Sequence, residues 1–483
     1  MSVSGFMKAG VCVVCVWLSL VVAGCGGSGG ERVETGTEAP VFPDCSGCTV
    51  PVNIAPLNFC FLKRCDEVEA VFGTGDGTAF SCRGNQYVDI PVRKWRRLLE
   101  RAAADGGEVV VTVSARNGKR WETFLPRKFR VAPEAIDEWI SYRLIYPGYE
   151  RWAHMGLYQR RLTDFREKVM LDNRLTGNNC MNCHTSWERS PDRFVFHLRG
   201  KNGGTVLVRD GECRRIEAEV GGKPVPLVYP AWHPEGRYVA FSSNSTRQLF
   251  HAGPEKLVEV YDEWSDVLLY DTETGELVRD SSLLMRGDVF ETYPAWSPDG
   301  KRFYFCASAA AEMPEEYKSI KYSVCSVGFD ARERRFSGPV DTVLSILDRS
   351  VVFPRISPDG RHMVAVALDY GCFPVWHREA DLVVWDLKEG RQVAHDANSF
   401  DSESFPVWSS NGRWVMFTSR RDDGLFTRLW FAYCGEDGRL CKPFPLPQRG
   451  ALLRDTRMKS YNTPQFMTGE VTLSQGSLFV TEE

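Results

Sequence analysis

The stretch Tyr229-Pro230-Ala231-Trp232-His233-Pro234-Glu235-Gly236 occurs four times in this chain in varied form. Further copies begin at Tyr293, Phe353 and Phe405, each with a proline in second place and a glycine-containing turn at the end. Successive copies are roughly 50 to 65 residues apart, a length that fits one four-stranded propeller blade with variable loops. The repetition indicates a propeller in the C-terminal half of the chain.

The local chemistry of each copy agrees with this interpretation. Asp-Gly and Asn-Gly turns supply the positive backbone angles of a tight hairpin, and the proline before the turn ends the incoming strand. The returning strand alternates apolar and polar residues, as at Tyr238 and Ala240, so that one face can pack on a neighbouring sheet. A single blade cannot bury both of its faces, so the repeats are expected to stack around an axis.

The four copies closely resemble the TolB-like propeller repeat, a WD40-like unit with the signature aromatic-Pro-x-Trp-Ser-Pro-Asp-Gly. Two further segments, Phe196 to Val208 and Tyr461 to Phe466, look like degenerate partners. The resemblance implies a mainly β protein with a five- or six-bladed β-propeller over 194–483. The last segment is expected to close the ring by pairing with earlier strands, which hides exposed strand edges.

The N-terminus predicts export. An apolar run after Lys8 is too short for a comfortable membrane span and ends in small residues before Cys25, which resembles a bacterial lipobox. Residues 1–24 are therefore expected to be a lipoprotein signal peptide, Cys25 the lipidated residue and 25–50 a flexible tether. The alternative is an uncleaved anchor. Either way the body is predicted outside the cytoplasm, lipid-anchored to the bacterial cell envelope on its periplasmic or cell-surface side.

Two regions lie between the tether and the propeller. Residues 51–130 contain strand-like stretches and a helix-like run over 92–104, which predicts a small β-rich or α+β domain. Residues 131–193 show apolar spacing typical of two amphipathic helices separated by Pro147-Gly148. These helices are expected to belong to a short helical haem-binding segment.

That expectation comes from Cys180-Met181-Asn182-Cys183-His184, which spells C-x-x-C-H. Two thiols at this spacing can form thioether bonds to haem, and the adjacent imidazole can reach the iron. The motif predicts one covalent haem c on Cys180 and Cys183, with His184 as the proximal iron ligand. The chain thus resembles a bacterial class in which a short c-type haem segment is fused to a TolB-like propeller.

The sixth iron position stays open. His197 is close enough in sequence to fold back, and a His-His pair would give a low-spin haem suited to electron transfer. A packed strand histidine is the alternative interpretation of His197. Met155 and His154 are rival distal ligands, although Met155 lies in an apolar stripe and is also a natural core residue.

Other candidate groups allow two interpretations each. Cys45 and Cys48 form a second C-x-x-C without a following His, so it predicts a disulfide in an exported chain, with a zinc site shared with Cys180 and Cys183 as the less favoured choice. Cys434 and Cys441 flank a turn and are possible hairpin partners. Acidic residues of the propeller loops predict a solvated rim or else a calcium or peptide site: Asp262, Glu263, Asp266, Asp401 and Glu403.

Composition bounds the function. The 483 residues carry a formal net charge of -4 with both signs interspersed, which argues against nucleic acid as a partner. G-x-S-x-G, P-loop and H-E-x-x-H motifs are missing, which weakens hydrolase and nucleotide hypotheses. The sequence therefore predicts an anchored c-type cytochrome that transfers electrons to or from a redox protein partner. The alternatives are a haem enzyme that reduces peroxide or a nitrogen oxide, and a non-redox envelope binding or assembly protein.

Overall fold

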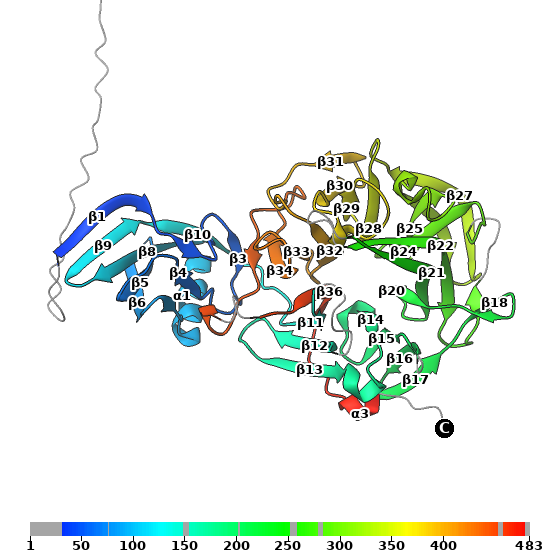
Figure 1. The fold of residues 1–483 in the computed structure, drawn as a ribbon, viewed down its shortest axis with the longest axis horizontal. Coiled ribbons are helices and arrows are strands. Elements are labelled where there is room, and N and C mark those ends of the chain that lie inside the picture. The colour runs from blue at the N-terminus through cyan, green and yellow to red at the C-terminus, as the bar shows by residue number, and fades with distance from the viewer. Residues whose placement is uncertain are drawn as a thin grey trace, which may run out of the picture.

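The computed structural model describes residues 31–75, 77–147, 154–200, 203–251, 258–278, 284–452 and 457–478. Over these residues the chain is mainly β and forms an N-terminal sheet domain beside a ring of sheets (Figure 1). None of the described helices has the length and apolar character needed to span a membrane. The predicted signal peptide over 1–24 and the lipidation site Cys25 lie outside the described residues and stay predictions.

The N-terminal domain consists of two sheets and one long helix. The helix α1 (Val92–Ala104) buries Trp95, Leu98 and Leu99, as its apolar spacing predicts. The larger sheet contains β1 (Glu31–Glu38), β9 (Arg120–Leu125), β8 (Glu108–Asn117), β10 (Arg127–Ala132), β3 (Thr49–Pro51), β5 (Glu67–Thr74) and β6 (Gly77–Gly84). The smaller sheet contains β2 (Val41–Phe42), β4 (Phe59–Phe61) and β7 (Tyr87–Val88).

Six four-stranded antiparallel sheets follow, and the strands of each sheet are ordered from the inner to the outer edge of the ring. The first sheet contains β14 (Met181–Ser186), β15 (Arg193–Leu198), β16 (Gly204–Arg209) and β17 (Glu212–Ile216). The second contains β20 (Val228–Trp232), β21 (Tyr238–Phe250), β22 (Val258–Asp271) and β23 (Leu277–Val278). The third contains β24 (Val289–Trp296), β25 (Arg302–Ala309), β26 (Ser323–Asp330) and β27 (Arg335–Leu344).

The other three contain β28 (Ser350–Ile356), β29 (His362–Leu368), β30 (Asp381–Asp386) and β31 (Arg391–Val393); β32 (Glu403–Trp408), β33 (Trp414–Ser419), β34 (Arg428–Tyr433) and β35 (Phe444–Pro445); and β36 (Ser460–Met467), β11 (Trp139–Ile145), β12 (Gly156–Arg161) and β13 (Glu167–Asp172). The shorter elements are β18 (Glu219–Val220), β19 (Lys223–Pro224), η1 (Asn173–Thr176), η2 (Trp187–Arg189), η3 (Tyr317–Ser319), η4 (Pro374–Trp376) and α3 (Gln475–Leu478).

The inner strands form a closed ring. Each of β14, β20, β24, β28, β32 and β36 packs against the next, and β36 packs back against β14. Closure depends on the antiparallel pairing of β36 with β11, which joins the C-terminal part of the chain to the start of the ring (Figure 1). The predicted propeller fold is confirmed, and so is the expectation that the last segment pairs with an early strand.

Every inner strand carries one bulge at the same place. The bulge residue has a positive φ in all six strands: Cys183 (φ 54), Tyr229 (φ 49), Tyr293 (φ 52), Phe353 (φ 54), Phe405 (φ 52) and Thr463 (φ 42). The pairing register shifts at each of these points. A bulge bends its strand and redirects a side chain, and here it turns aromatic rings toward one another. Ring centroids are 4.7 Å apart for Tyr229 and Tyr293 and 3.8 Å apart for Tyr293 and Phe353.

The repeated tryptophan joins adjacent sheets. Trp296 Nε1 donates to the Ala231 carbonyl at 3.2 Å, and Trp408 Nε1 donates to the Arg355 carbonyl at 2.9 Å. Each acceptor lies two residues beyond the bulge of the neighbouring inner strand. Trp232 Nε1 makes the equivalent bond to the Thr185 carbonyl at 3.1 Å. Thr185, two residues after Cys183, therefore occupies the same place in the repeat.

The prediction of two helices within 131–193 is wrong. Those residues form β11, β12, β13 and β14, and the ring therefore starts at Trp139 and not at residue 194. Nearly every residue of β11 is buried, including the polar Ser141 and Arg143, so the strand shows no alternation of apolar and polar residues. Without that alternation, the spacing of its apolar residues resembles that of an amphipathic helix. The tether predicted for 25–50 is also too long, because β1, β2 and the start of β3 lie within it.

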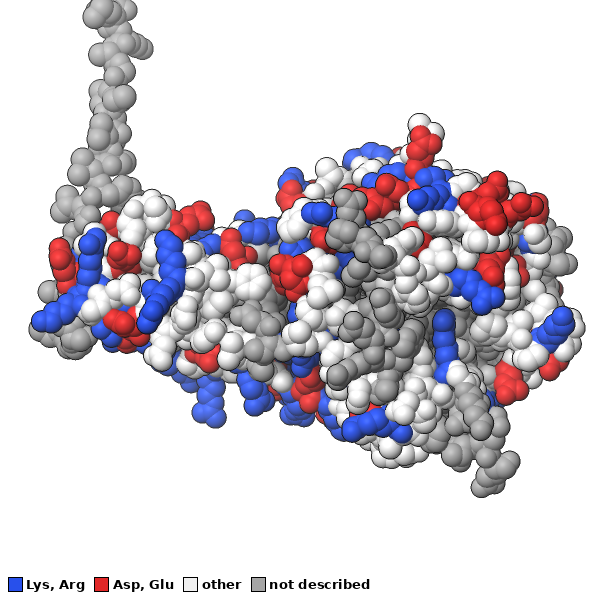
Figure 2. All heavy atoms as spheres, in the orientation of Figure 1, with Lys and Arg blue, Asp and Glu red and all other residues white. Residues whose placement is uncertain are grey.

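Contacts between the two parts are specific. One hydrophobic core includes residues of α1, β8, β33 and β34. Asn58 Nδ2 donates to the carbonyls of Gln448 and Arg449 at 2.9 and 2.8 Å. On the face shown in Figure 2 basic and acidic side chains are interspersed over both parts.

A glycine in the repeat tests the packing of adjacent sheets. Gly300 (φ 70) lies against the buried His233, whose Nε2 would be 2.4 Å from a Cβ at this position. Gly360 has a similar φ of 72, but its Cβ would meet Pro298 only at 3.7 Å. We expect Gly360→Ala to reduce the free energy of unfolding by about 1 kcal/mol through backbone strain alone. Gly300→Ala should cost at least about twice as much in urea denaturation, and equal losses would contradict the close contact with His233.

Candidate functional site

The C-x-x-C-H residues lie on β14, the inner strand of the first sheet. Cys183 stands where four of the other five inner strands have an aromatic residue and the fifth has Thr463. His184 stands where all five have proline. The degenerate repeat that the sequence suggested at Phe196 lies on the second strand of this sheet, β15. The haem motif is therefore itself the degenerate copy of the propeller signature.

The arrangement of these residues does not fit a haem. Cys183 is 3% exposed and His184 is 4% exposed, both within the packed inner ring. The imidazole Nε2 of His184 is hydrogen-bonded to Ser141 Oγ at 3.0 Å, so the nitrogen that would bind iron is in use. No group of three or more His, Cys, Asp or Glu side chains among the described residues could hold a metal ion.

The predicted distal ligands have other roles. His197 Nδ1 is hydrogen-bonded to Thr205 Oγ1 at 2.8 Å, and burial lowers the pKa of His197 to about 3, helped by the charge of Arg199. Met155 is a core residue whose sulfur accepts a hydrogen bond from the Met181 amide at 3.4 Å. The ring of His154 lies 6.5 Å from that of Tyr146. These contacts agree with the alternative interpretations, in which His197 is a packed strand residue and Met155 is a core residue.

A polar site that the sequence did not predict surrounds the motif. We call it the arginine site and define it by Arg143, Asn179, Asn182, His184 and Arg199. Arg143 is 8% exposed, and its Nη1 donates to the Met181 carbonyl at 3.1 Å. Four buried atoms here have no hydrogen-bond partner in the described part of the chain: Arg143 Nε, Asn179 Nδ2, Asn182 Oδ1 and His184 Nδ1.

Arg199 brings a second positive charge. Its amide donates to the Cys180 carbonyl at 2.7 Å, at the end of the β14–β15 ladder, and Arg143 Nη1 lies 4.0 Å from the Sγ of the same Cys180. The residue is exposed, yet its charge acts on Cys183, Tyr229 and Asp262, which come from three different strands. Next to it, Asn179 Oδ1 would lie 2.4 Å from a Cβ on Gly200. The site is thus open on the side of Arg199 and closed on the side of His184.

The acidic loop residues do not form a solvated rim. Asp401 and Glu403 are buried in ion pairs with Arg420 and Arg421, at 3.1 and 2.8 Å. Asp262 is also buried, and desolvation raises its pKa to about 6 against hydrogen bonds from Asn244 and Thr246. The side chain of Glu263 is 36% exposed, and burial raises the pKa of the half-buried Asp266. The solvated-rim prediction is therefore wrong for Asp262, Asp401 and Glu403.

The cysteines of the predicted zinc site lie in different parts of the molecule. Cys45 and Cys48 lie in the N-terminal domain, away from Cys180 and Cys183 on the inner ring, and no metal-binding group joins them in the described range. Cys45, Cys48, Cys434 and Cys441 are all free thiols in this structure.

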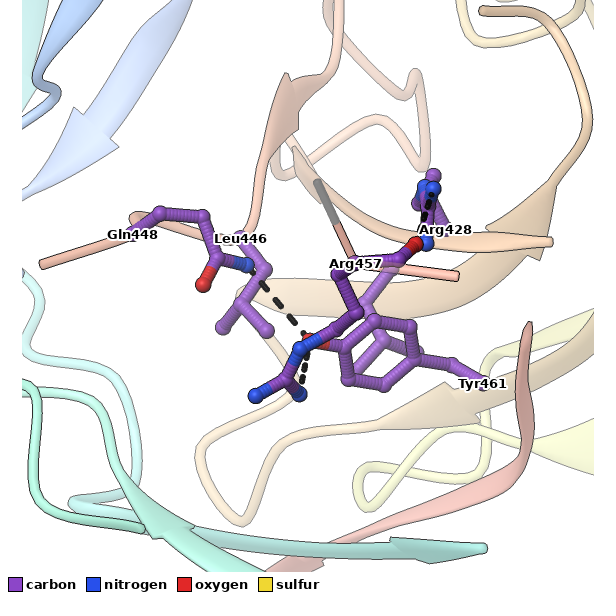
Figure 3. Close-up of a pocket in the computed structure, with 6 residues that line it drawn as sticks. Arg428, Leu446, Gln448, Arg457 and Tyr461 are labelled. Atoms are coloured by element: carbon purple, nitrogen blue, oxygen red, sulfur yellow. Dashed lines mark hydrogen bonds between the residues drawn. The ribbon is translucent and has the colours of Figure 1, made fainter. Parts of the chain in front are cut away.

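A small cavity lies near the ring closure (Figure 3). Its volume is about 10 Å³, room for a single water molecule, and Arg457 Nη1 donates to Tyr461 Oη beside it at 2.7 Å. Arg457 also forms an ion pair with Glu167 at 2.7 Å, and Glu167 accepts from Tyr142 Oη at 2.5 Å. These bonds connect β11, β13 and β36, so the cavity belongs to the closure of the ring.

No protein-family model matches the chain, and no curated protein does. Among solved structures, the chain is similar to a puromycin hydrolase (TM-score 0.38, 13% identity, 65% of this chain and 53% of that chain). It is also similar to a puromycin-hydrolyzing peptidase of Mycobacterium tuberculosis (TM-score 0.38, 10% identity, 64% and 54%) and to prolyl oligopeptidase B of Galerina marginata (TM-score 0.35, 10% identity, 70% and 42%). The chain spans about half the length of these proteins.

The predicted function as an electron-transferring c-type cytochrome is wrong. The motif residues form a buried propeller bulge, and His184 Nε2 is hydrogen-bonded to Ser141. The same geometry removes the alternative of a haem enzyme. The cytochrome prediction was wrong because C-x-x-C-H occurs here by chance in a cysteine-rich chain, on a strand that belongs to the propeller.

Glu167 provides a test of the closure network. Burial would raise its pKa, but hydrogen bonding and charge from Arg457, with further contributions from Tyr142 and Arg160, hold it below its ordinary value. Glu167→Gln leaves the buried Arg160 and the bonded Arg457 without a counter-charge, and we expect a loss of about 2 kcal/mol in the free energy of unfolding.

Because the folded pKa of Glu167 is depressed, its contribution is present above pH 4.5 and is lost as the pH falls through the folded value. Urea denaturation should therefore show a smaller difference in the free energy of unfolding between the native protein and Glu167→Gln near pH 3 than at pH 7. Glu470→Gln, which removes the ion pairs with the exposed Arg166 and Lys168, is the control and should change little at either pH. A deficit that does not depend on pH would contradict this role for Glu167.

His184 provides a second test. Burial lowers its pKa to about 4, the charge of Arg143 adds to this effect and the bond to Ser141 opposes it. We expect the imidazole to stay neutral from pH 8 down to pH 5 in NMR titrations of its ring resonances, assigned with His184→Gln. The exposed His251 serves as the internal comparison. Titration of His184 near pH 6.5 would contradict its burial in the ring.

Proposed function

We propose that the protein is a ligand-binding β-propeller protein that holds an anionic group, a carboxylate or a phosphate, at the arginine site. The observation that carries this proposal is Arg143. It is 8% exposed, its Nη1 is bonded to a carbonyl, its Nε has no partner, and no ion pair of Arg143 is found in the described part of the chain. A buried guanidinium without a counter-charge is costly, and an incoming anion supplies that charge.

The groups around Arg143 suit such a ligand. Arg143 Nε and Asn179 Nδ2 are donors without a partner, and His184 Nδ1 donates when its Nε2 accepts from Ser141. Guanidinium groups bind carboxylate and phosphate oxygens through charge-assisted hydrogen bonds. Asn182 Oδ1 is an unpartnered acceptor, and it matches a hydroxyl on the same ligand.

Access to the site runs past Arg199. This exposed side chain lies opposite Cys180, and both Asn179 and Cys180 are half-buried. The charge of Arg199 raises the local concentration of anions at the opening. The charged end of a ligand would enter toward Arg143 while the rest of the molecule stays near Arg199.

The test compares thermal unfolding in inorganic phosphate, acetate and chloride at constant ionic strength. We expect phosphate or acetate to raise the melting temperature of the native protein, since a ligand at a hundred times its Kd adds about 2.7 kcal/mol of stability. Arg143→Met should remove this response. Without added anion it should be at least as stable as the native protein, because it removes a buried uncompensated charge.

Arg130→Met is the matched control, because Arg130 is an exposed arginine of the N-terminal domain. Its anion response should equal that of the native protein. The proposal would be contradicted if neither anion raised the melting temperature of the native protein, or if both raised that of Arg143→Met by the full amount.

A further inference from the structure

The turn Cys45-Ser46-Gly47-Cys48 brings two thiols together in the N-terminal domain. The Cys48 amide donates to the Cys45 carbonyl at 3.3 Å, and Gly47 takes a φ of 73 that favours glycine. A four-residue turn of this kind holds its end Cα atoms within about 7 Å, close to the range that a disulfide spans.

The two thiols differ in exposure. Cys48 is fully buried, and its Sγ lies 3.3 Å from the Pro443 carbonyl of the propeller part. The neighbouring Cys45 thiol and burial raise the pKa of the Cys48 thiol. Cys45 is half-buried and lines a cavity of about 50 Å³ together with Trp95 and Phe129. An external reagent therefore reaches Cys45 first.

Cationic side chains surround the turn. Arg127 Nε donates to Ser46 Oγ at 2.6 Å, and Lys442 Nζ donates to the Ser46 carbonyl at 2.8 Å. Asp44 balances part of this charge through its ion pair with Arg127. The turn that carries both thiols is therefore bordered by an arginine and a lysine.

We propose that Cys45 and Cys48 form a dithiol–disulfide couple that exchanges with small external disulfides. The Cys45 thiolate attacks one sulfur of glutathione disulfide, forms a mixed disulfide and releases one glutathione thiolate. Cys48 then loses its proton and attacks the Cys45 sulfur, which closes the Cys45–Cys48 bond and releases the second glutathione. Two protein thiols are oxidised, one glutathione disulfide is reduced to two thiols, and the two protons end on those thiols.

The experiment treats the reduced full-length protein with glutathione disulfide, alkylates the remaining thiols and maps the peptides by mass spectrometry. We expect the peptide with Cys45 and Cys48 to lose both alkylation sites and to carry an internal disulfide. Cys48→Ser should stop at the mixed disulfide and retain one glutathione on Cys45. Cys45→Ser should leave Cys48 as a free thiol, because Cys48 is shielded.

The Cys434→Ser/Cys441→Ser double variant is the matched control, since it removes another nearby pair and should leave the reaction unchanged. Circular dichroism verifies that each variant is folded. If both thiols remain fully alkylatable in a large excess of glutathione disulfide, the proposal is overturned. It is equally overturned if Cys48→Ser acquires no glutathione. Neither outcome bears on anion binding at Arg143, which lies in the other part of the molecule.

Discussion

The pairing of β36 with β11 is the interaction on which the rest of the ring depends. Five of the six sheets take all four strands from one continuous stretch, whereas the sixth combines β11, β12 and β13 with a strand from the C-terminal part of the chain. The pairing hides the edge of β11 and brings β36 against β14 and β32. The ion pair between Arg457 and Glu167 secures the same junction from the side.

The ring imposes one backbone geometry on six unlike sequences. Tyrosine, phenylalanine, threonine and cysteine all take the positive φ of the bulge, although such angles are uncommon outside glycine. Where the residue is aromatic, its ring fills the centre of the propeller. Where it is Cys183 or Thr463, the side chain is smaller, and unpartnered polar atoms such as Asn182 Oδ1 and Thr463 Oγ1 lie nearby. The arginine site occurs on this less aromatic side of the ring.

The repeats beginning at Tyr229, Tyr293, Phe353 and Phe405 could be predicted because turn glycines, prolines and tryptophans are local signals. The first and last sheets could not be placed correctly, since their inner strands have lost most of that signature. At β11 the burial of Ser141 and Arg143 removed the alternation that marks a strand. The arginine site was missed for the same reason, because a buried arginine without a counter-charge is visible only once the strands are assembled. The helix over 92–104 was predictable, since it packs one apolar face.

The C-terminal origin of β36 also has a consequence for biosynthesis. A ribosome releases β11 several hundred residues before the strand that completes its sheet, so the ring cannot close until that strand has been made. Until then the inner edge of β11 is an open template for pairing with another chain. A transcript cut short before Ser460 would keep that edge open permanently, and its product would be prone to aggregate even though most of its sheets are intact.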